Sequence, residues 1–198
     1  MEVSSTSQVK TKTPLIAAAP LRADAERNRE RILAAAEAVF LEYGAGAPLE
    51  YVAKRAGVGI GTLYRRFPTR EALFAAMYST HFSSFAEVSR ARDAEFDAIG
   101  ALRAYLEDLV MHTNLYRGFA ASLGMVLQTG SAGCHATSQE GKRLLARAQK
   151  AGAIRQDVSF DDLVCVVTAT SLAVEKGGSP RPRIAHLIGL FINGIGKR

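Results

Sequence analysis

The chain has 198 residues, of which 48% are apolar and 22% are charged, and its formal net charge is +6. A chain of this length and composition can bury its own core, which excludes low-complexity, collagen-like and disulfide-stapled scaffolds. The modest positive charge is compatible with nucleic acid as a partner, but by itself it identifies none.

The cysteines and the apolar runs exclude further classes. Cys134 and Cys165 have no partner at metal-ligand spacing, so we expect two free thiols, no metal site and no cofactor. No apolar run reaches about eighteen residues, and the first residues lack the apolar core of a signal peptide. We therefore expect a cytoplasmic protein that does not enter a membrane.

The N-terminal part begins with a flexible arm. Residues 1–23 are rich in Ser, Thr, Ala and Pro and show no sustained period. Apolar residues then recur at helical spacing from Asp24, a favourable N-cap, to Tyr43. Residues 22–70 carry nine Lys or Arg against six Asp or Glu, so the positive charge is denser here than in the rest of the chain.

The run from Val52 to Phe67, V-A-K-R-A-G-V-G-I-G-T-L-Y-R-R-F, predicts two short helices joined by a tight turn. The first begins near Pro48, where a missing N–H costs nothing. Gly57 and Gly59 lie in the turn, where glycine tolerates a left-handed backbone. In the second helix Leu63 faces inward, which leaves small, hydroxyl and guanidinium groups exposed. Such groups suit the major groove of DNA and its phosphates.

The rest of the chain predicts further helices and no strand, because β-branched runs are short and lack a period of two. Thr69 can cap a long helix that follows Pro68. The fold class is thus all-α, with about nine helices in a three-helix N-terminal head and a larger C-terminal domain. The later elements are expected at Asp97–Thr113, near Tyr116–Gln128, as a loop at Thr129–Ser138, and at Gln139–Ala151, Ser159 to about Glu175 and Arg183 to about Asn193.

The pattern G-V-G-I-G-T-L-Y-R-R-F-P-T-R-E-A-L-F, with V-A-K-R-A before it and R-I-L-A-A-A-E-A-V-F upstream, resembles the TetR/AcrR family of transcriptional repressors. The detailed match covers Arg27 to Phe74, about a quarter of the chain. The resemblance implies a helix-turn-helix DNA-binding domain at residues 24–70 and a helical regulatory and dimerisation domain at residues 71–198. It also implies a sequence-specific regulator, most simply a repressor that a small-molecule ligand releases from its operator.

The resemblance assigns DNA contacts to the second short helix and its flanks. Thr62 and Tyr64 match hydroxyls that bind backbone phosphates, and Arg70 matches a basic position at the start of the next helix that also meets phosphate. Other positions approach base edges, where Arg65 can bind a guanine through two hydrogen bonds. The expected DNA-binding residues are Gly59, Ile60, Gly61, Thr62, Tyr64, Arg65, Arg66 and Arg70.

The sequence departs from the family at the start of the first short helix. Many relatives place a phosphate-binding Ser or Thr there, whereas this chain has Pro48, Leu49 and Glu50. Glu50 would repel phosphate unless Lys54, four residues on, pairs with it. This helix is therefore expected to contribute less to DNA binding.

In the family, the fourth to seventh helices usually enclose a pocket for a small molecule. Aromatic and soft residues of these helices are the pocket candidates, although most residues of this kind form the core. His112 and Gln128 are the polar members, which fit the few polar anchors of a mostly apolar site. The candidates are Phe82, Phe85, Tyr105, Met111, His112, Phe119, Met125 and Gln128.

The last two predicted helices, L-V-C-V-V-T-A-T-S-L-A-V and I-A-H-L-I-G-L-F-I, are apolar on nearly all sides. A helix with one side in water carries a polar face, so we expect a second copy of the chain to cover both. A two-fold homodimer through these helices, the eighth and ninth, would place one recognition helix in each half of a palindromic, double-stranded DNA operator.

Three functions other than a ligand-responsive repressor are alternatives for this chain. An interaction protein with the helix-turn-helix shape but no specific operator is compatible with the modest charge and with Glu50. A DNA-binding protein without an effector would show a filled core in its later helices. An enzyme is disfavoured, because Cys134-His135 has no further ligand at suitable spacing and no catalytic motif occurs.

Overall fold

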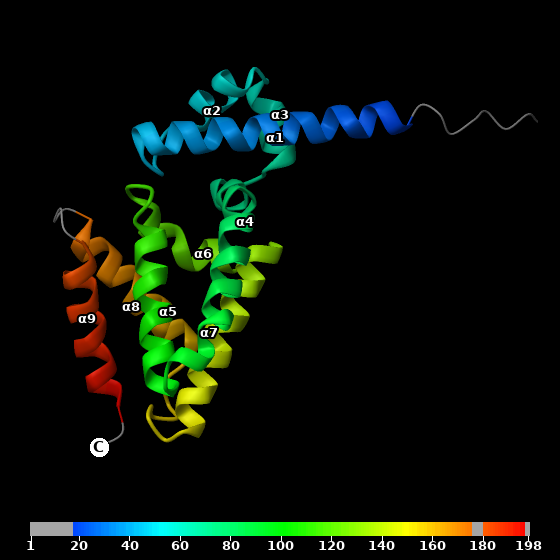
Figure 1. The fold of residues 1–198 in the computed structure, drawn as a ribbon. Coiled ribbons are helices and arrows are strands. Elements are labelled where there is room, and N and C mark those ends of the chain that lie inside the picture. The colour runs from blue at the N-terminus through cyan, green and yellow to red at the C-terminus, as the bar shows by residue number, and fades with distance from the viewer. Residues whose placement is uncertain (1–17, 176–179, 197–198) are drawn as a thin grey trace, which may run out of the picture.

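The computed structural model describes residues 18–175 and 180–196. Over these residues the chain forms nine α-helices and two short 3-10 helices, and its one extended pairing is a bridge between Ile154 and Gly196. The all-α prediction is confirmed. Figure 1 shows a small head, α1 to α3, which α4 joins to a larger helical body. Most of the predicted arm, residues 1–17, lies outside the described residues.

The head consists of three helices, α1 (Ala18–Tyr43), α2 (Leu49–Ala56) and α3 (Ile60–Arg66). The first helix was expected at Asp24 but begins earlier. The residues before Asp24 are rich in alanine, which favours helix, and the proline among them lies in the first turn, where it is tolerated. Ile32, Phe40 and Leu63 are at most 1% exposed and form the centre of the head.

One of the two glycines in the turn between α2 and α3 is required by its backbone. Gly57 ends α2 with φ +65°, in the left-handed region, and its N–H donates to the Lys54 carbonyl. Gly59 is the N-cap of α3 and has φ −68°, a conformation open to any residue. The prediction of a left-handed backbone is therefore confirmed for Gly57 and wrong for Gly59.

Helix α4 (Arg70–Ala91) joins the head to the body. Thr69 caps it as expected, because its side chain accepts a hydrogen bond from the Ala72 N–H. The ring of Phe74 stacks on Phe40 of the head with centroids 4.4 Å apart, and it lies 4.9 Å from the ring of Phe119 in the body. Aromatic packing therefore continues from the head through α4 into the body.

In the body α7 packs against α4 and α5, α8 lies behind them, and α9 flanks α5 on the side away from α4 (Figure 1). Asp97 and Ser159, at which two helices were expected to begin, are the N-caps of these helices, and Ser159 forms a capping box with Asp162. The remaining elements are η2 (Asp93–Glu95), α5 (Ala98–Thr113), η3 (Phe119–Ser122), α6 (Leu123–Leu127), α7 (Ala132–Lys150), α8 (Phe160–Val174) and α9 (Pro180–Ile195).

The loop predicted at Thr129–Ser138 is wrong, because α7 already begins at Ala132. Ser131 caps the helix by accepting a hydrogen bond from the Cys134 N–H. The small residues that suggested a loop serve close packing instead. A Cβ on Gly133 would lie 2.1 Å from the carbonyl oxygen of Ser79 on α4, so the two helices can approach this closely only at a glycine.

Two other boundaries differ from the expected ones. The helix expected near Tyr116–Gln128 is interrupted, because Gly118 adopts φ +81° and a short 3-10 turn precedes α6. Helix α9 begins at Pro180 rather than at Arg183, since proline is well accommodated at the first position of a helix. Neither difference changes the order of the elements.

Candidate DNA-binding surface and regulatory cleft

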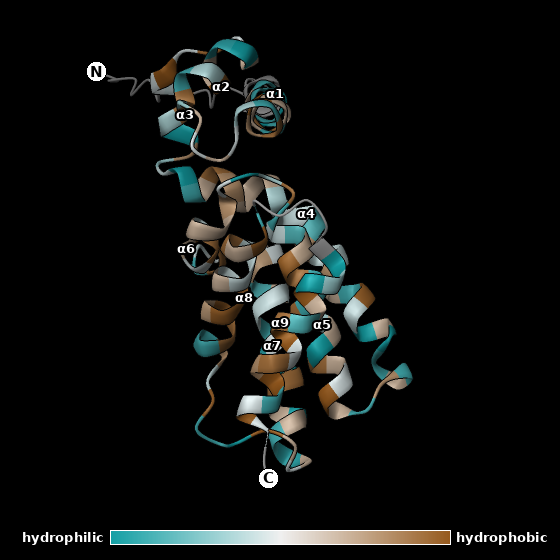
Figure 2. Ribbon diagram, turned by 90° about the vertical axis from the view of Figure 1, so that its left-hand side faces the viewer, coloured by the Kyte–Doolittle hydropathy of each residue, from teal (hydrophilic) through white to brown (hydrophobic). Residues whose placement is uncertain are grey.

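Helix α3 has one buried and one exposed side. Leu63 is fully buried and Phe67 is 5% exposed, so both anchor the helix to the head. Figure 2 shows hydrophilic and hydrophobic residues alternating along α2 and α3, as expected for short helices with a single buried face. Of the expected DNA-binding residues, Thr62 and Arg70 are half-buried and the exposed ones are Gly59, Ile60, Gly61, Tyr64, Arg65 and Arg66.

The start of α3 carries two glycines and so has no side chains at these positions, and the fold itself does not require glycine there. Gly59 and Gly61 are exposed, neither has a positive φ, and a Cβ built on either would meet no atom within 4 Å. Alanine would be the better helix former at Gly61. Neither the packing nor the backbone conformation of the protein therefore requires glycine at these positions. Without a side chain, the backbone is accessible to the surface of a binding partner.

The two arginines of α3 differ in their contacts. Arg65 Nη2 donates to the Thr62 hydroxyl at 3.0 Å, on the same exposed face of the helix. Arg66 lies 3.5 Å from a carboxylate oxygen of Glu26 on α1. Both are exposed, so these contacts are weak and either guanidinium can exchange its partner for a phosphate or a base. Arg65 is the better placed of the two, because no carboxylate competes for it.

Arg70 has a contact that the sequence did not predict. Its Nη1 donates to the carbonyl oxygens of Ala45 and Ala47, both at 2.7 Å, and its guanidinium carbon lies 5.9 Å from the centre of the Phe40 ring. Arg70 therefore clamps the start of α4 to the loop between α1 and α2. The expected phosphate contact would have to share the guanidinium with these two carbonyls.

A second contact holds the same loop from the body. The Ala45 N–H donates to the carbonyl of Arg117 at 2.8 Å, and Arg117 Nη2 donates to the Tyr43 carbonyl at 3.3 Å. The loop that follows α1 is thus bound both by the start of α4 and by the turn after α5. A movement of α4 relative to this turn would be transmitted to the head through these bonds.

The start of α2 is unfavourable for phosphate, as expected. Pro48 is its N-cap and offers no side-chain cap, and Glu50 is exposed in the first turn. Glu50 forms no ion pair with Lys54, whereas Arg55 pairs with Glu42 of α1 at 3.0 Å. The negative charge at the N-terminus of α2 therefore remains uncompensated by this lysine.

The interior of the body is filled where a pocket was expected. Phe82 and Phe119 are at most 1% exposed, and the ring of Phe119 stacks on Tyr78 at 4.9 Å. Three other candidates lie apart: Met125 is 57% exposed, Gln128 borders a surface hollow between α6 and α7, and Met111 faces a groove beside α9. The structure thus brings together only Phe85, Tyr105 and His112 of the eight.

These three residues line a partly open cleft between α4 and α5, with a volume of about 190 Å³. Sequence reasoning missed most of its wall. Polar residues do recur at helical spacing along α4 and along α5 in the sequence. That these two polar stripes face each other across a cleft becomes clear only from the structure. The missed residues that define the cleft chemically are His81, Ser84, Val88, Arg92, Phe96 and Asp108.

The charges of the cleft are balanced within it. Arg92 donates to the Asp108 carboxylate at 3.1 Å, and its guanidinium carbon lies 5.2 Å from the centre of the Phe96 ring. Burial lowers the pKa of His112; the carboxylate of Asp108 opposes this shift and His81 adds to it. His112 is therefore neutral at pH 7, with one ring nitrogen able to donate and the other able to accept.

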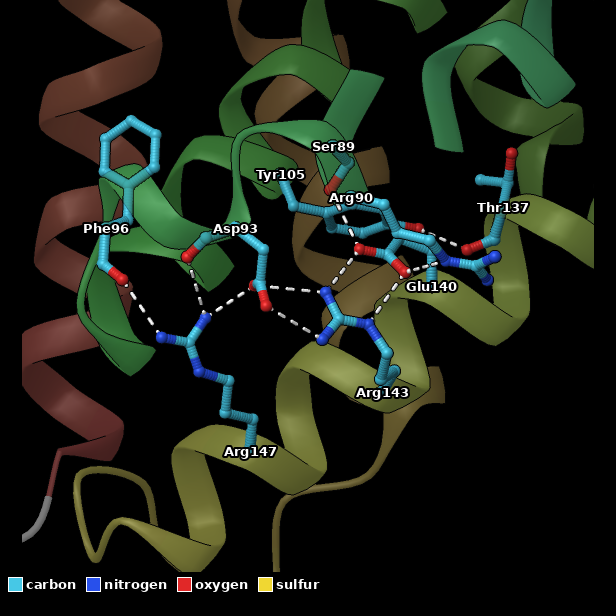
Figure 3. Close-up of polar contacts among 9 residues, drawn as sticks. All are labelled: Ser89, Arg90, Asp93, Phe96, Tyr105, Thr137, Glu140, Arg143 and Arg147. Carbon is cyan, nitrogen blue, oxygen red and sulfur yellow. Dashed lines mark hydrogen bonds and ion pairs between the residues drawn. The ribbon is translucent and has the colours of Figure 1, made fainter. Parts of the chain in front are cut away.

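A buried carboxylate on α7 lies next to the cleft and is hydrogen-bonded to its wall residue Ser89. Glu140 accepts hydrogen bonds from Arg143 at 2.8 and 2.9 Å, from Arg90 at 3.0 Å and from Ser89 at 3.2 Å (Figure 3). Burial would raise the pKa of Glu140, but these hydrogen bonds, with that of Arg143 the strongest, hold it below its usual value. The buried charge is thus fully paired.

The network continues along α7 to η2. Asp93 accepts from Arg143 and from Arg147, and Arg147 also donates to the Phe96 carbonyl at 3.0 Å (Figure 3). The hydrogen bond from Arg143 is the main cause of the lowered pKa of Asp93. These bonds attach the C-terminal end of α4 and η2 to α7, so the lower part of the cleft is the rigid part.

Helices α8 and α9 carry apolar residues on their outer faces. On α8 the exposed residues after Asp162 are Cys165, Ala169, Leu172 and Ala173, and Leu172 is 47% exposed. On α9 Leu190 is 58% exposed, although Arg183, His186 and Asn193 are exposed with it. The outer face of α8 is therefore the more apolar of the two.

The thiol of the pair Cys134-His135 is not accessible from solvent. Cys134 is completely buried, and burial raises the pKa of its thiol. In the part of the chain that the structure describes, no three His, Cys, Asp or Glu side chains gather where they could hold a metal ion. No helix of that part is long and apolar enough to cross a membrane.

Two parts of the chain match family models. Residues 32–77 match the bacterial regulatory proteins of the tetR family, and residues 97–197 match the C-terminal domain of SbtR-like transcriptional regulators. The second match spans half of the chain. The chain therefore belongs to the TetR family of bacterial transcriptional regulators. No curated protein is similar enough to the chain to match it.

Solved structures agree with this assignment. The TetR transcriptional regulator SCO0520 from Streptomyces coelicolor is 33% identical, with a TM-score of 0.50, and the match covers 85% of this chain and 98% of that one. RolR, solved with resorcinol, is 19% identical with a TM-score of 0.62 and coverages of 89% and 91%. FadR from Bacillus subtilis, solved with stearoyl-CoA, is 16% identical with a TM-score of 0.57 and coverages of 84% and 98%. The last two share the fold.

Proposed function

We propose that the protein is a sequence-specific DNA-binding repressor, that it acts as a homodimer on a palindromic operator, and that a small-molecule effector releases it. Membership of the TetR family supports regulation through DNA binding. Such a regulator meets its operator in the cytoplasm, where we expect it to act.

The observation that carries the proposal is the bare start of α3. Gly59 and Gly61 leave the backbone open toward solvent, although the fold has room for a side chain at both. Ile60, Tyr64 and Arg65 surround them with an apolar group, a hydroxyl and a guanidinium. A helix that is bare at its start and flanked by such groups can enter the major groove, reach base edges and hold phosphates.

Selection of bound fragments from random-sequence duplexes tests the DNA part of the proposal. Gly61→Leu should abolish binding to the selected operator, whereas Gly46→Leu, a change at another glycine with open space around it, should leave binding intact. Arg65→Ala should relax the preference at one base pair of each half-site by about 1–3 kcal/mol. A uniform loss of affinity for all sequences would contradict its role in reading bases.

A helix-turn-helix interaction protein without an operator is the alternative, and salt separates the two. Phosphate binding predicts that log K falls with log salt with a slope of about −0.9 for each phosphate neutralised. Equal affinity for selected and scrambled duplexes, or no dependence on salt, would favour the interaction protein.

The homodimer is proposed from the outer faces of α8 and α9. A second copy would cover Leu172 and Leu190, which a monomer leaves in water. The two α3 helices would then be related by a two-fold axis, as a palindromic operator requires. Sedimentation of the full chain tests this part, and a monomer at micromolar concentration would contradict it.

The two observations on the effector point in opposite directions. The filled interior around Phe82 and Phe119 favours a DNA-binding protein that answers to no small molecule. The cleft beside α4 favours an effector, because a ligand there touches the helix whose first residue clamps the head. An effector can shift the protein between its operator-binding and released states only if its affinity for these two states differs. Equal operator affinity with and without a cleft ligand would reject the switch.

A further inference from the structure

The cleft between α4 and α5 limits the size of its ligand. Its volume of about 190 Å³ exceeds the roughly 150 Å³ of an apolar cavity that holds benzene, and it falls below the roughly 300 Å³ at which sites for drug-sized ligands begin. One six-membered ring with a small substituent fits this volume. A long acyl chain exceeds this volume and would project into solvent.

The wall of the cleft favours an aromatic ring. The ring of Phe85 lies 5.1 Å from the ring of Tyr105 and 5.1 Å from that of His112, with tilted and edge-on geometries. Val88 completes this side of α4 and is 55% exposed. Aromatic pairs prefer such offset and edge-to-face arrangements, so a flat ring in the cleft gains more than an aliphatic group of the same area.

The polar groups of the cleft favour an uncharged ligand with a hydroxyl. Arg92 and Asp108 neutralise each other, so a charged ligand would have to break their ion pair. His112 is the polar group that stands against the Phe85 ring, and its imidazole makes no side-chain hydrogen bond with any described residue. It stands at the end of the cleft nearer the head, with His81 of α4 as the second imidazole of that end. A neutral imidazole accepts a hydrogen bond from a hydroxyl.

We propose that the cleft binds an uncharged single-ring phenol, with the ring against Phe85 and Val88 and the hydroxyl donating to His112. This proposal names the class of ligand for the effector site of the proposed function. The effect of the ligand on operator binding rests on the proposed function, whereas ligand binding itself does not. A ring in the cleft would separate the upper part of α4 from α5, while the Glu140 network holds the lower part in place. The displacement would therefore reach Arg70 and the loop that it clamps.

Calorimetric titration of the full chain, free of DNA, with phenol, toluene and benzoate tests the site. Phenol should bind at least tenfold more tightly than toluene, which lacks the donor, and than benzoate, which carries a charge. Val88→Phe should fill the cleft and remove phenol binding, while Met125→Phe, a change at an equally exposed residue outside the cleft, should leave it unchanged. His112→Phe should bind phenol no more tightly than toluene.

The outcomes distinguish a failure of the proposed ligand site from a failure of the proposed regulatory function. The site is overturned if no probe binds at its solubility limit, if phenol and toluene bind the native chain equally, or if Val88→Phe binds phenol like the native chain. Mobility-shift titrations with the selected operator are then made with and without phenol. Phenol binding with unchanged operator affinity would support the site and reject the effector part of the proposed function. Circular dichroism of each variant shows that it is folded.

Discussion

Replacing Arg70 with methionine distinguishes a structural clamp from a phosphate contact. Methionine keeps an apolar stem beside Phe40 but removes both hydrogen bonds to the carbonyls of Ala45 and Ala47. A hydrogen bond from a charged donor contributes about 1.5–3 kcal/mol, and the half-buried carbonyls regain part of this from water. We therefore expect the loop after α1 to lose about 2 kcal/mol of local stability.

Amide hydrogen exchange measures this loss at the Ala45 N–H, which donates to the Arg117 carbonyl in the same loop. A loss of about 2 kcal/mol makes its exchange roughly 30-fold faster. Arg65→Met is the matched control, because Arg65 is exposed and its hydrogen bond to Thr62 stabilises by less than about 0.5 kcal/mol. If Arg70→Met leaves exchange unchanged and instead lowers the salt slope of DNA binding by about 0.9, Arg70 contacts phosphate and the clamp is unimportant.

Three further predictions concern the body. Glu140→Gln should lower the free energy of unfolding by about 3 kcal/mol, because it leaves the arginines around it without their carboxylate. The folded-state pKa of Glu140 is below its unfolded value, so the ionised carboxylate stabilises the native chain above about pH 4.3, and this contribution is lost as the pH falls through the folded-state pKa. Urea titrations at pH 7 and at acid pH should therefore show a smaller acid loss in the variant. Gly133→Val should destabilise by about 3 kcal/mol, since its Cβ would overlap a carbonyl oxygen of α4, whereas Gly46→Ala should change thermal stability little; equal effects would contradict the close packing of α7. Leu190→Asp should shift the chain toward monomer in sedimentation, and an unchanged dimer would place the interface elsewhere.

Local chemistry in the sequence was sufficient for the elements with strong end signals. Thr69 caps a helix in the structure as predicted, and Asp97 and Ser159 cap the helices that were expected to begin at them, because an N-cap needs only a side-chain oxygen and the N–H groups of the next turn. The turn glycine Gly57 was equally readable, since its left-handed backbone depends on neighbours in sequence alone. The exposed face of α3 followed from the inward position predicted for Leu63.

The misread positions are those at which distant segments meet. Gly133 looked like part of a loop because its reason for being small, the backbone of α4, lies more than fifty residues away in sequence. The contact of Arg70 with two carbonyls was not predicted, because those carbonyls belong to a loop more than twenty residues away in sequence; its phosphate contact stays a prediction. Of the expected pocket residues, only Phe85, Tyr105 and His112 line the cleft, because the partner helix decides which side chains of a helical stripe become core and which become wall.

By itself, the amino-acid order determined the helical class, the helix-turn-helix head and the face it presents, because periodicity, caps and turns act within a few residues. Only the tertiary structure decided that Phe82 and Phe119 are core, that His112 and Asp108 share a cleft with Arg92, and that Glu140 is a buried, paired charge. These outcomes depend on how closely whole helices approach one another, and that distance is set by the packing of all their side chains together.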